Sequence, residues 1–414
     1  MTRRDFGCNT PRMSVAREVT SDGVPAGGPL RIAMVIDAWD EANNGAVVST
    51  RRFTDLLRAR GHTVEVLATG VPAPGKVPFP TFYIPTPGNI MQRMRLPFGW
   101  PERRRLEEAL ARQDMVHVQF PFYLGMRAIA VARARGLPVV STFHVQAEHL
   151  LHNVGIRNRR MVDWTYRFFL RTTYNRSDHV VCPSAFAERE LRGYGLRVPS
   201  SVISNGVPPE YRPLPRAECP RFEGKFTILS VGRLAREKRH DLLMEAIRAS
   251  PHEKRIQLVI LGDGPLKEKL QEQGRTLTNP PVFRWLKPAE LIPYYGGADL
   301  CVHAAEVEVE CMSVLEAMAC GLPCVIADSP LSATPQFALS KEFLFQTGSR
   351  EDLTRKIDHW IEHPEALARA RVEYREASQR YSVEASLEKL LAVYRQVVDA
   401  RAGAAPGGGA GAGR

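Results

Sequence analysis

The chain has 414 residues, 44% of them hydrophobic and 24% charged, which is a globular composition too long for a single hydrophobic core. Its net charge of +11 favours an anionic partner, although charge alone does not distinguish a nucleotide from nucleic acid or an acidic membrane surface. Because the cysteines are scattered singly and no stretch is apolar enough for a membrane span or a signal peptide, we expect a cytoplasmic protein, neither secreted nor inserted in the membrane.

The first part of the sequence alternates strand-length apolar runs with helical patterns. After a leader at residues 1–29 that we expect to be disordered, Leu30–Ala38 predicts a strand, Thr50–Arg60 a helix and Thr63–Ala68 a second strand. Further apolar runs follow at Met115–Gln119, Leu137–Phe143, His179–Cys182 and Ser201–Ile203. Such runs are typical of a parallel sheet covered on both faces, so residues 30–207 are predicted to form one α/β domain.

A second series of the same kind begins after a proline-rich linker at residues 208–224. It predicts a second α/β domain at 225–380, a final helix at 381–401 that packs back on the first domain, and a disordered tail at 402–414. Its predicted strands are Phe226–Val231, Ile256–Leu261, Val282–Trp285, Asp299–His303 and Pro323–Ala327. Two doubly wound domains in tandem predict a ligand cleft between the carboxyl ends of their strands.

A basic turn follows the first of these strands. The letters GRLAREKRHDLLMEA place Gly232, Arg233 and Lys238 between a strand and a helix. Two cations beside free helix amides suit a diphosphate, although a solvated turn capped by glycine gives the same pattern. The later LGDGP is a glycine turn, and the chain has no dinucleotide or P-loop fingerprint.

An acid-rich loop lies at the same predicted edge. In EVEVECMSVLEAMACGLP, Glu308 falls in the loop, and Glu316 falls on a helix that begins near Met312. Carboxylates accept hydrogen bonds from vicinal hydroxyls, and helix amides favour anions, so a sugar with an attached phosphate fits this loop. The alternative is that these acids only stabilise the start of the helix.

Four motifs in this order resemble one family of enzymes. GRLAREK, LGDGP, YYGGADLCVHAA and E-x7-E followed by EAMACGLPCVIA resemble the retaining nucleotide-sugar glycosyltransferases of family 4, and the resemblance spans about residues 30–400. It implies the GT-B fold, with two Rossmann-like doubly wound domains that face each other across a cleft. It also implies a hexosyltransferase with a nucleotide-sugar donor.

The resemblance implies a role for each matching residue of the second domain. Arg233 and Lys238 would hold the donor diphosphate, Glu308 would bind hydroxyls of the donor sugar, and Glu316 would bind the ribose. Backbone amides at the start of the helix would contact the sugar and the phosphates, and these belong to Cys311, Met312 and Ser313. Cys311 stands where the family usually has glycine, and a cysteine disfavours a positive φ there.

From the first domain, the resemblance implies a histidine beside the anomeric carbon and a loop near the donor phosphate. STFHVQAEH places His144 in the first role, and the turn Asn43–Asn44–Gly45 places Gly45 in the second. The implied reaction is a front-side transfer with retention, in which cations and helix amides stabilise the leaving diphosphate. Because the chain has neither a metal-ligand motif nor an Asp-x-Asp triplet, we expect no essential metal and no cofactor.

A basic and aromatic stretch, Arg157–Arg176, points to the acceptor. At helical spacing, three arginines cluster beside an apolar face, and the residues are Arg160, Arg167 and Arg171 beside Met161, Trp164, Thr165 and Phe168. A second such stretch is Arg93–Arg105. This pattern suits an anionic membrane surface, and the alternative is a core helix with a solvated arginine edge.

The letters ECMSVLEAMACGLP, ADSPLSATPQFAL and NNGAVVSTRRF resemble the branch of the family that includes diacylglycerol glucosyltransferases. This implies UDP-glucose as the donor, a lipid hydroxyl such as that of diacylglycerol as the acceptor, and peripheral attachment to the inner face of the membrane. A polysaccharide or a phosphatidylinositol-type lipid stays open as the acceptor. From other classes, a nucleotide-sugar epimerase of the same fold and a non-catalytic anion-binding protein stay open, whereas we expect no nucleic-acid partner.

Overall fold

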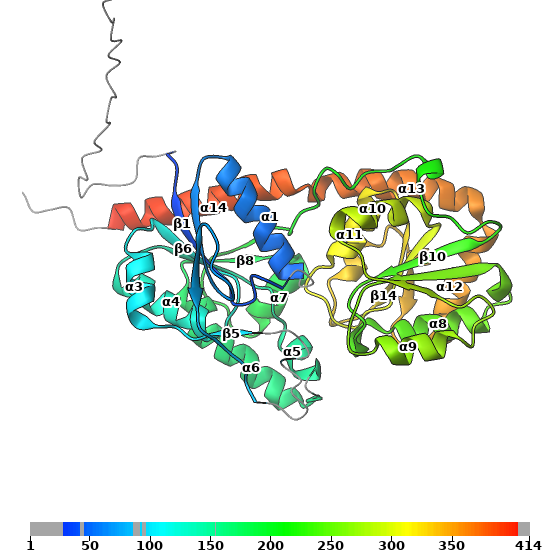
Figure 1. Cartoon of the computed structure of the whole chain (residues 1–414), viewed down its shortest axis with the longest axis horizontal. Coiled ribbons are helices and arrows are strands. Elements are labelled where there is room, and N and C mark those ends of the chain that lie inside the picture. Colours follow the sequence, from blue (N-terminus) through cyan, green and yellow to red (C-terminus); the bar gives the residue numbers. More distant parts are fainter. Residues whose placement is uncertain (1–27, 42–44, 86–91, 93–96, 154, 405–414) are drawn as a thin grey trace, which may run out of the picture.

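The computed structural model describes residues 28–41, 45–85, 92, 97–153 and 155–404, which form two separate parallel sheets and one small antiparallel pair (Figure 1). The predicted doubly wound α/β architecture is confirmed by these two sheets. The expectations for residues 1–27, for Asn43 and Asn44, for residues 93–96 and for the tail after residue 404 concern residues outside the described ranges.

The first sheet has seven parallel strands in the order β3-β2-β1-β6-β7-β8-β9. Its central strands are the continuous apolar runs of the sequence, because helices cover both faces and leave no solvated side. The edge strand β3 was not predicted, since a lysine and a proline interrupt its pattern. The strands are β1 (Arg31–Val35), β2 (Thr63–Thr69), β3 (Lys76–Phe79), β6 (Met115–Val118), β7 (Val139–Thr142), β8 (His179–Cys182) and β9 (Ser200–Val202).

The helices around this sheet include one that begins earlier than the sequence pattern indicated. The predicted helix Thr50–Arg60 begins at Gly45, because Val47 extends the buried stripe that Phe53 and Leu57 continue. The helices are α1 (Gly45–Ala59), α3 (Arg103–Leu110), α4 (Tyr123–Ala134), α5 (Ala147–Asn153), α6 (Arg159–Thr172), α7 (Ala185–Gly193) and the 3₁₀ turn η2 (Tyr174–Arg176). The antiparallel pair is β4 (Thr81–Phe82) with β5 (Phe98–Gly99).

The second sheet has six parallel strands in the order β12-β11-β10-β13-β14-β15. The predicted strands Phe226–Val231 and Ile256–Leu261 are confirmed residue for residue, since both are long buried runs. The strands are β10 (Phe226–Val231), β11 (Ile256–Leu261), β12 (Val282–Arg284), β13 (Leu300–His303), β14 (Cys324–Asp328) and β15 (Leu344–Gln346).

Helices also flank the second sheet, with α11 packed on α13, and α8 packed on α9 and α12. They are α8 (His240–Ala249), α9 (Lys267–Gly274), α10 (Pro288–Gly297), α11 (Met312–Ala319), α12 (Arg350–Glu362) and α13 (Pro364–Ser378). The 3₁₀ turns are η3 (Arg216–Glu218), η4 (Arg236–Lys238), η5 (Glu253–Arg255), η6 (Thr334–Phe337), η7 (Lys341–Phe343) and η8 (Gln379–Tyr381). In the described ranges, no helix is both long and apolar enough to span a membrane.

The last helix, α14 (Val383–Ala404), joins the core of the first sheet although it follows α13 of the second half (Figure 1). Its Tyr394 hydroxyl lies 2.6 Å from Nδ1 of His117 on β6, and Nε2 of the same ring lies 2.7 Å from the Thr142 hydroxyl on β7. Burial lowers the pKa of His117 to about 3, so the imidazole is neutral. The helix is therefore tied to the sheet by a buried polar contact as well as by apolar packing.

The two sheets place the sequence motifs at equivalent points. Strand order reverses between β1 and β6 in the first sheet and between β10 and β13 in the second, and ligands bind open α/β sheets at such switch points. The basic turn follows β10, and the acid-rich loop follows β13. The LGDGP turn lies directly against the basic turn, since a Cβ atom on Gly264 would come within 2.5 Å of the Leu234 carbonyl oxygen.

Replacing Tyr394 by phenylalanine is expected to destabilise the protein. The change leaves one ring nitrogen of buried His117 without a partner, which costs about 1–3 kcal/mol. Urea unfolding followed by circular dichroism measures the loss, and Tyr123→Phe, at a tyrosine that is 41% exposed, is the matched control. An unfolding midpoint equal to that of the control would contradict a stabilising role for this contact.

Candidate active site

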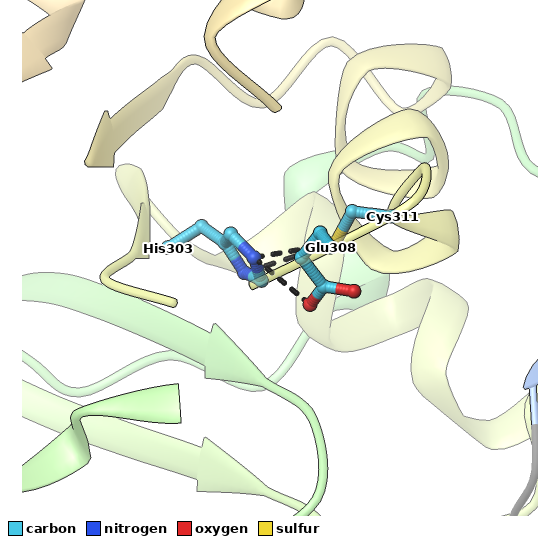
Figure 2. A group of neighbouring side chains, drawn as sticks. All are labelled: His303, Glu308 and Cys311. Atoms are coloured by element: carbon cyan, nitrogen blue, oxygen red, sulfur yellow. Dashed lines mark hydrogen bonds and ion pairs between the residues drawn. The ribbon is translucent and has the colours of Figure 1, made fainter. Parts of the chain in front are cut away.

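The acid-rich loop carries a half-buried ion pair at Glu308. One oxygen of this carboxylate, Oε1, is paired with Nζ of Lys238 from the basic turn and lies 3.3 Å from Nε2 of His303 at the end of β13 (Figure 2). The backbone of Glu308 is fixed from the other side, where the Ala333 amide donates to its carbonyl oxygen at 2.8 Å. The basic turn and the acid-rich loop are thus joined at one point.

The electrostatics of this group favour full charge separation. Burial opposes ionisation of Glu308, but the Lys238 charge and the His303 hydrogen bond outweigh it and lower its pKa to about 2. The pKa of Lys238 is raised, because Glu308 and Cys311 outweigh the effect of burial. Burial also lowers the pKa of His303, yet contacts with Cys311 and Glu308 raise it to about 10. The carboxylate therefore stays ionised between two cationic groups.

The start of α11 lies against the end of β10. The Ser313 hydroxyl donates to the Val231 carbonyl oxygen at 3.1 Å, one residue before Gly232 of the basic turn. Cys311 has a φ of 171°, which is extended backbone, so the positive φ that would disfavour cysteine does not arise. Met312 is the first residue of α11 and is half-buried.

Glu316, one turn along α11, contacts one helix beside the first sheet and one helix beside the second. Its Oε1 lies 3.2 Å from Nη2 of Arg52 on α1, and Oε2 accepts a hydrogen bond of 3.1 Å from the Tyr295 hydroxyl on α10. Burial raises the pKa of Glu316, and Arg52 opposes that change. In the described ranges, Nη1 of Arg52 is buried without a hydrogen-bond partner, so this guanidinium retains a donor for a ligand.

Glu310 also connects the two halves. It accepts hydrogen bonds from the backbone amide and from Nδ2 of Asn205, at 2.9 and 2.7 Å, while the Ser49 hydroxyl on α1 donates to Oδ1 of Asn205. Burial raises the pKa of Glu310 to about 7, although the Asn205 hydrogen bonds favour the ionised form. Glu306, by contrast, pairs with Arg239 within the second half. The acids of the loop thus have distinct surroundings.

His144 follows β7 at the opposite wall of the junction. Its Nε2 lies 3.0 Å from Oε1 of Gln119, and burial lowers its pKa to about 4, so the neutral ring donates this hydrogen bond. Two residues later, Gln146 donates to the Leu331 carbonyl oxygen of the second half at 3.1 Å, and α5 contacts η4, which ends at Lys238. The His144 loop therefore lies against the basic turn.

Two further predicted residues do not join this hydrogen-bonded group. In the part of the chain that the structure describes, the half-buried Arg233 guanidinium has no hydrogen bond or ion pair, and burial lowers its pKa. Gly45 is the first residue of α1 and has open space where a Cβ would lie. Both residues follow a strand at the switch point of their sheet. Among the predicted site residues that the structure describes, side-chain contacts join Lys238 to Glu308 and Cys311 to Ser313.

The sequence reading missed several residues that shape the site. His303 and Tyr295 lie in the motif YYGGADLCVHAA, and the strand-end position of His303 was a signal for it. Arg52 and Asn205 gave no such signal, because their contacts with Glu316 and Glu310 depend on how the two halves pack.

One group in the described ranges has the chemistry of a metal site. The ligand atoms of His303, Glu308 and Cys311 all lie within 4.8 Å of one another (Figure 2). Lys238 is paired with an oxygen of Glu308 in the same group.

Comparison with known proteins agrees with this architecture. A family profile described as Glycosyltransferase Family 4 matches residues 43–211, and one described as Glycosyl transferases group 1 matches residues 213–378. Sucrose-phosphate synthase from Thermosynechococcus elongatus has the same overall fold, with a TM-score of 0.69 at 19% identity over 90% of this chain and 100% of that chain. The two family matches and the fold thus define a retaining glycosyltransferase with the GT-B fold.

Relatives at higher identity establish the family. A GDP-mannose-dependent alpha-mannosyltransferase of Mycolicibacterium smegmatis is 31% identical over 316 residues, which cover 72% of this chain and 80% of the relative. An alpha-monoglucosyldiacylglycerol synthase of Streptococcus pneumoniae is 27% identical over 333 residues, which cover 73% of this chain and 72% of the relative. The chain belongs to glycosyltransferase family 4 and is a hexosyltransferase, as the sequence motifs predicted.

Glu316→Gln is expected to weaken nucleotide binding. A charged acceptor for a ribose hydroxyl contributes about 1.5–3 kcal/mol, which corresponds to a Kd for UDP raised roughly 10- to 150-fold. Isothermal titration calorimetry measures this change. Glu306→Gln, in the same loop but paired with Arg239, is the control and should bind like wild type. Equal UDP affinity in both variants would refute the ribose role.

Proposed function

We propose that this chain transfers glucose, with retention, from UDP-glucose to the hydroxyl of a membrane lipid, with diacylglycerol as the first choice. The assignment of the donor rests on charged residues at the facing edges of the two sheets. The assignment of the acceptor rests on one observation, the exposed basic and aromatic face of α6. The Streptococcus pneumoniae relative, named for the synthesis of a glucosyldiacylglycerol, supports the same acceptor.

Roles for the donor follow from charge and position. Arg233 and Lys238 would hold the diphosphate, since both lie on the turn after β10 and Arg233 makes no ion pair with the described residues that it would have to give up. Glu308 would accept from sugar hydroxyls, and Glu316 from the ribose. Gly45 and the amides at the start of α11, those of Cys311, Met312 and Ser313, would approach the phosphates and the sugar.

The transfer itself needs stabilisation of a departing diphosphate. Two cations and the amides of a helix start would supply it, and the leaving phosphate oxygen would take the proton of the acceptor hydroxyl on the same face. Neutral His144 would donate or accept a hydrogen bond near the anomeric carbon, and its contact with Gln119 fixes the ring. No protein carboxylate is required as a nucleophile.

The proposed acceptor face of α6 carries large apolar side chains that are exposed to solvent. Trp164 is 59% exposed and stacks on Phe168, with ring centroids 5.4 Å apart, and Met161 is 41% exposed. Exposed Arg160, Arg167 and Arg171 flank them. Thr165, which was expected on this face, is buried and donates its hydroxyl to the Met161 carbonyl oxygen. Aromatic rings beside arginines are the pattern of a helix that lies in an anionic lipid surface.

A second candidate is the transfer of mannose from GDP-mannose to a phosphatidylinositol-type lipid. The mannosyltransferase relative from Mycolicibacterium smegmatis, at 31% identity, favours this donor. The same α6 face would serve such a lipid, whereas a polysaccharide acceptor gives that face no role. The epimerase and the non-catalytic protein are not carried forward, because the family is one of transferases.

Labelled donors and defined liposomes separate these candidates. Purified protein is incubated with UDP-glucose or GDP-mannose, and with vesicles that contain diacylglycerol, phosphatidylinositol or neither. We expect label in the lipid fraction only with UDP-glucose and diacylglycerol. Transfer only from GDP-mannose to phosphatidylinositol would replace the proposal with the second candidate, and no transfer to either lipid would refute both.

Replacing Arg160, Arg167 and Arg171 by glutamine is expected to weaken vesicle binding. Each basic residue near an anionic surface contributes about 1 kcal/mol, so the triple variant should lose roughly 100-fold in affinity for vesicles rich in anionic lipid. Sedimentation of vesicles with the protein measures this change, while UDP affinity should stay constant.

The matched control removes the same charge from another place. The exposed arginines Arg248, Arg275 and Arg369 lie on the second half, and their replacement by glutamine should leave most vesicle binding intact. If both triple variants lose binding equally, net charge and not the α6 face attracts the membrane.

A further inference from the structure

We propose that His303, Glu308 and Cys311 form a binding site for a zinc-like divalent cation, and that the bound cation keeps the donor sugar out of the cleft. The inference concerns regulation of the donor site and therefore rests on the proposed role of Glu308. It goes beyond that role by assigning a function to His303 and to the cysteine that replaces the family's usual glycine.

The distances suit such an ion. A tetrahedral zinc ion, with nitrogen and oxygen ligands at about 2.0 Å and a thiolate at about 2.3 Å, holds its ligand atoms about 3.3–3.5 Å apart. Nε2 of His303 lies 3.3 Å from Oε1 of Glu308 and 3.5 Å from Sγ of Cys311. Two edges of the tetrahedron are therefore close to their final length. Figure 2 shows the three side chains and the contacts between them.

The chemical types of the three ligand atoms, and the regular elements that hold their residues, also favour a borderline-soft cation. Imidazole nitrogen, thiolate sulfur and carboxylate oxygen together suit zinc better than magnesium or calcium, which prefer oxygen alone. His303 ends β13 and Cys311 precedes α11, so two regular elements hold the loop at both ends. The Ser313 hydroxyl lies 3.3 Å from Sγ of Cys311 and donates to the Val231 carbonyl oxygen, which fixes the environment of the sulfur.

The cation must displace the Lys238 ammonium from one oxygen of Glu308, and it must also displace the ring proton of His303 and the thiol proton of Cys311, which pass to water. The Lys238 ammonium is paired with Oε1 of Glu308, the same oxygen that faces His303. A carboxylate accepts at two oxygens, so Glu308 can serve the cation with one and Lys238 with the other. Three protein ligands leave the fourth position of a tetrahedral ion for water.

Occupation of this site has a direct consequence for the donor. Glu308 bound to a cation no longer offers its lone pairs to sugar hydroxyls, and Lys238 moves relative to the diphosphate that it would hold. A zinc ion is therefore expected to compete with the nucleotide sugar and to inhibit transfer, which is the opposite of an essential metal.

Cobalt is the spectroscopic probe for this proposal. The whole chain is freed of metal by a chelator and titrated with cobalt(II) chloride. We expect a near-ultraviolet charge-transfer band from sulfur to cobalt, and we expect zinc chloride to abolish this band. Cys311→Gly, which restores the family's usual residue, should lose the band and bind zinc more weakly, by at least the 10- to 100-fold that loss of an outer-shell partner costs. Cys320→Ala, at a buried cysteine on the far end of α11, should keep the band.

The outcomes separate this proposal from the proposed function. If the charge-transfer band is absent, or if it is undiminished in Cys311→Gly, the metal site is overturned and the three side chains form a hydrogen-bonded cluster only. Turnover of the donor by the same sample would still support the proposed function. Zinc bound at Cys311 without any rise in the apparent KM for the nucleotide sugar overturns the competition and, with it, the role of Glu308 in sugar binding. Zinc-dependent loss of turnover in the wild-type protein but not in Cys311→Gly supports the whole proposal.

Discussion

Glu310 and Glu316 are buried and Glu308 is half-buried at the junction of the two halves, and a carboxylate shielded from water is stable only where cations or hydrogen-bond donors surround it. Each acid meets this demand differently. Glu308 uses Lys238 and His303 from its own half, Glu310 uses Asn205, and Glu316 uses Tyr295 together with Arg52 from α1. The arrangement of the cleft follows largely from where these partners lie.

The same demand explains how the junction can bind a ligand. Breaking a buried ion pair by removing one partner costs about 3–5 kcal/mol, so the partners cannot simply leave. A ligand that brings hydroxyls to Glu308 and Glu316, and phosphates to the cations near them, replaces each lost interaction with a new one. A nucleotide sugar carries both kinds of group.

Much of the fold and part of the site could be read from the sequence. Long buried runs such as β10 and β11 were predicted residue for residue, because burial on both faces leaves a continuous apolar signal. The short edge strands β3 and β15 lacked that signal. The ordered motifs placed Lys238 and Glu308 in one donor site but did not predict the ion pair between them. The contact of Arg52 with Glu316 could not be foreseen either, since it depends on packing between helices far apart in sequence.

The role of the cleft is tested most directly by a crystal structure of the protein with UDP-glucose. Our account predicts the ribose hydroxyls on Glu316 with Arg52 displaced from that carboxylate, the diphosphate on Arg233 and Lys238, and a sugar hydroxyl on Glu308. A nucleotide bound elsewhere, or bound in the cleft while Arg52 still holds Glu316 and Lys238 still holds Glu308 unchanged, would contradict it.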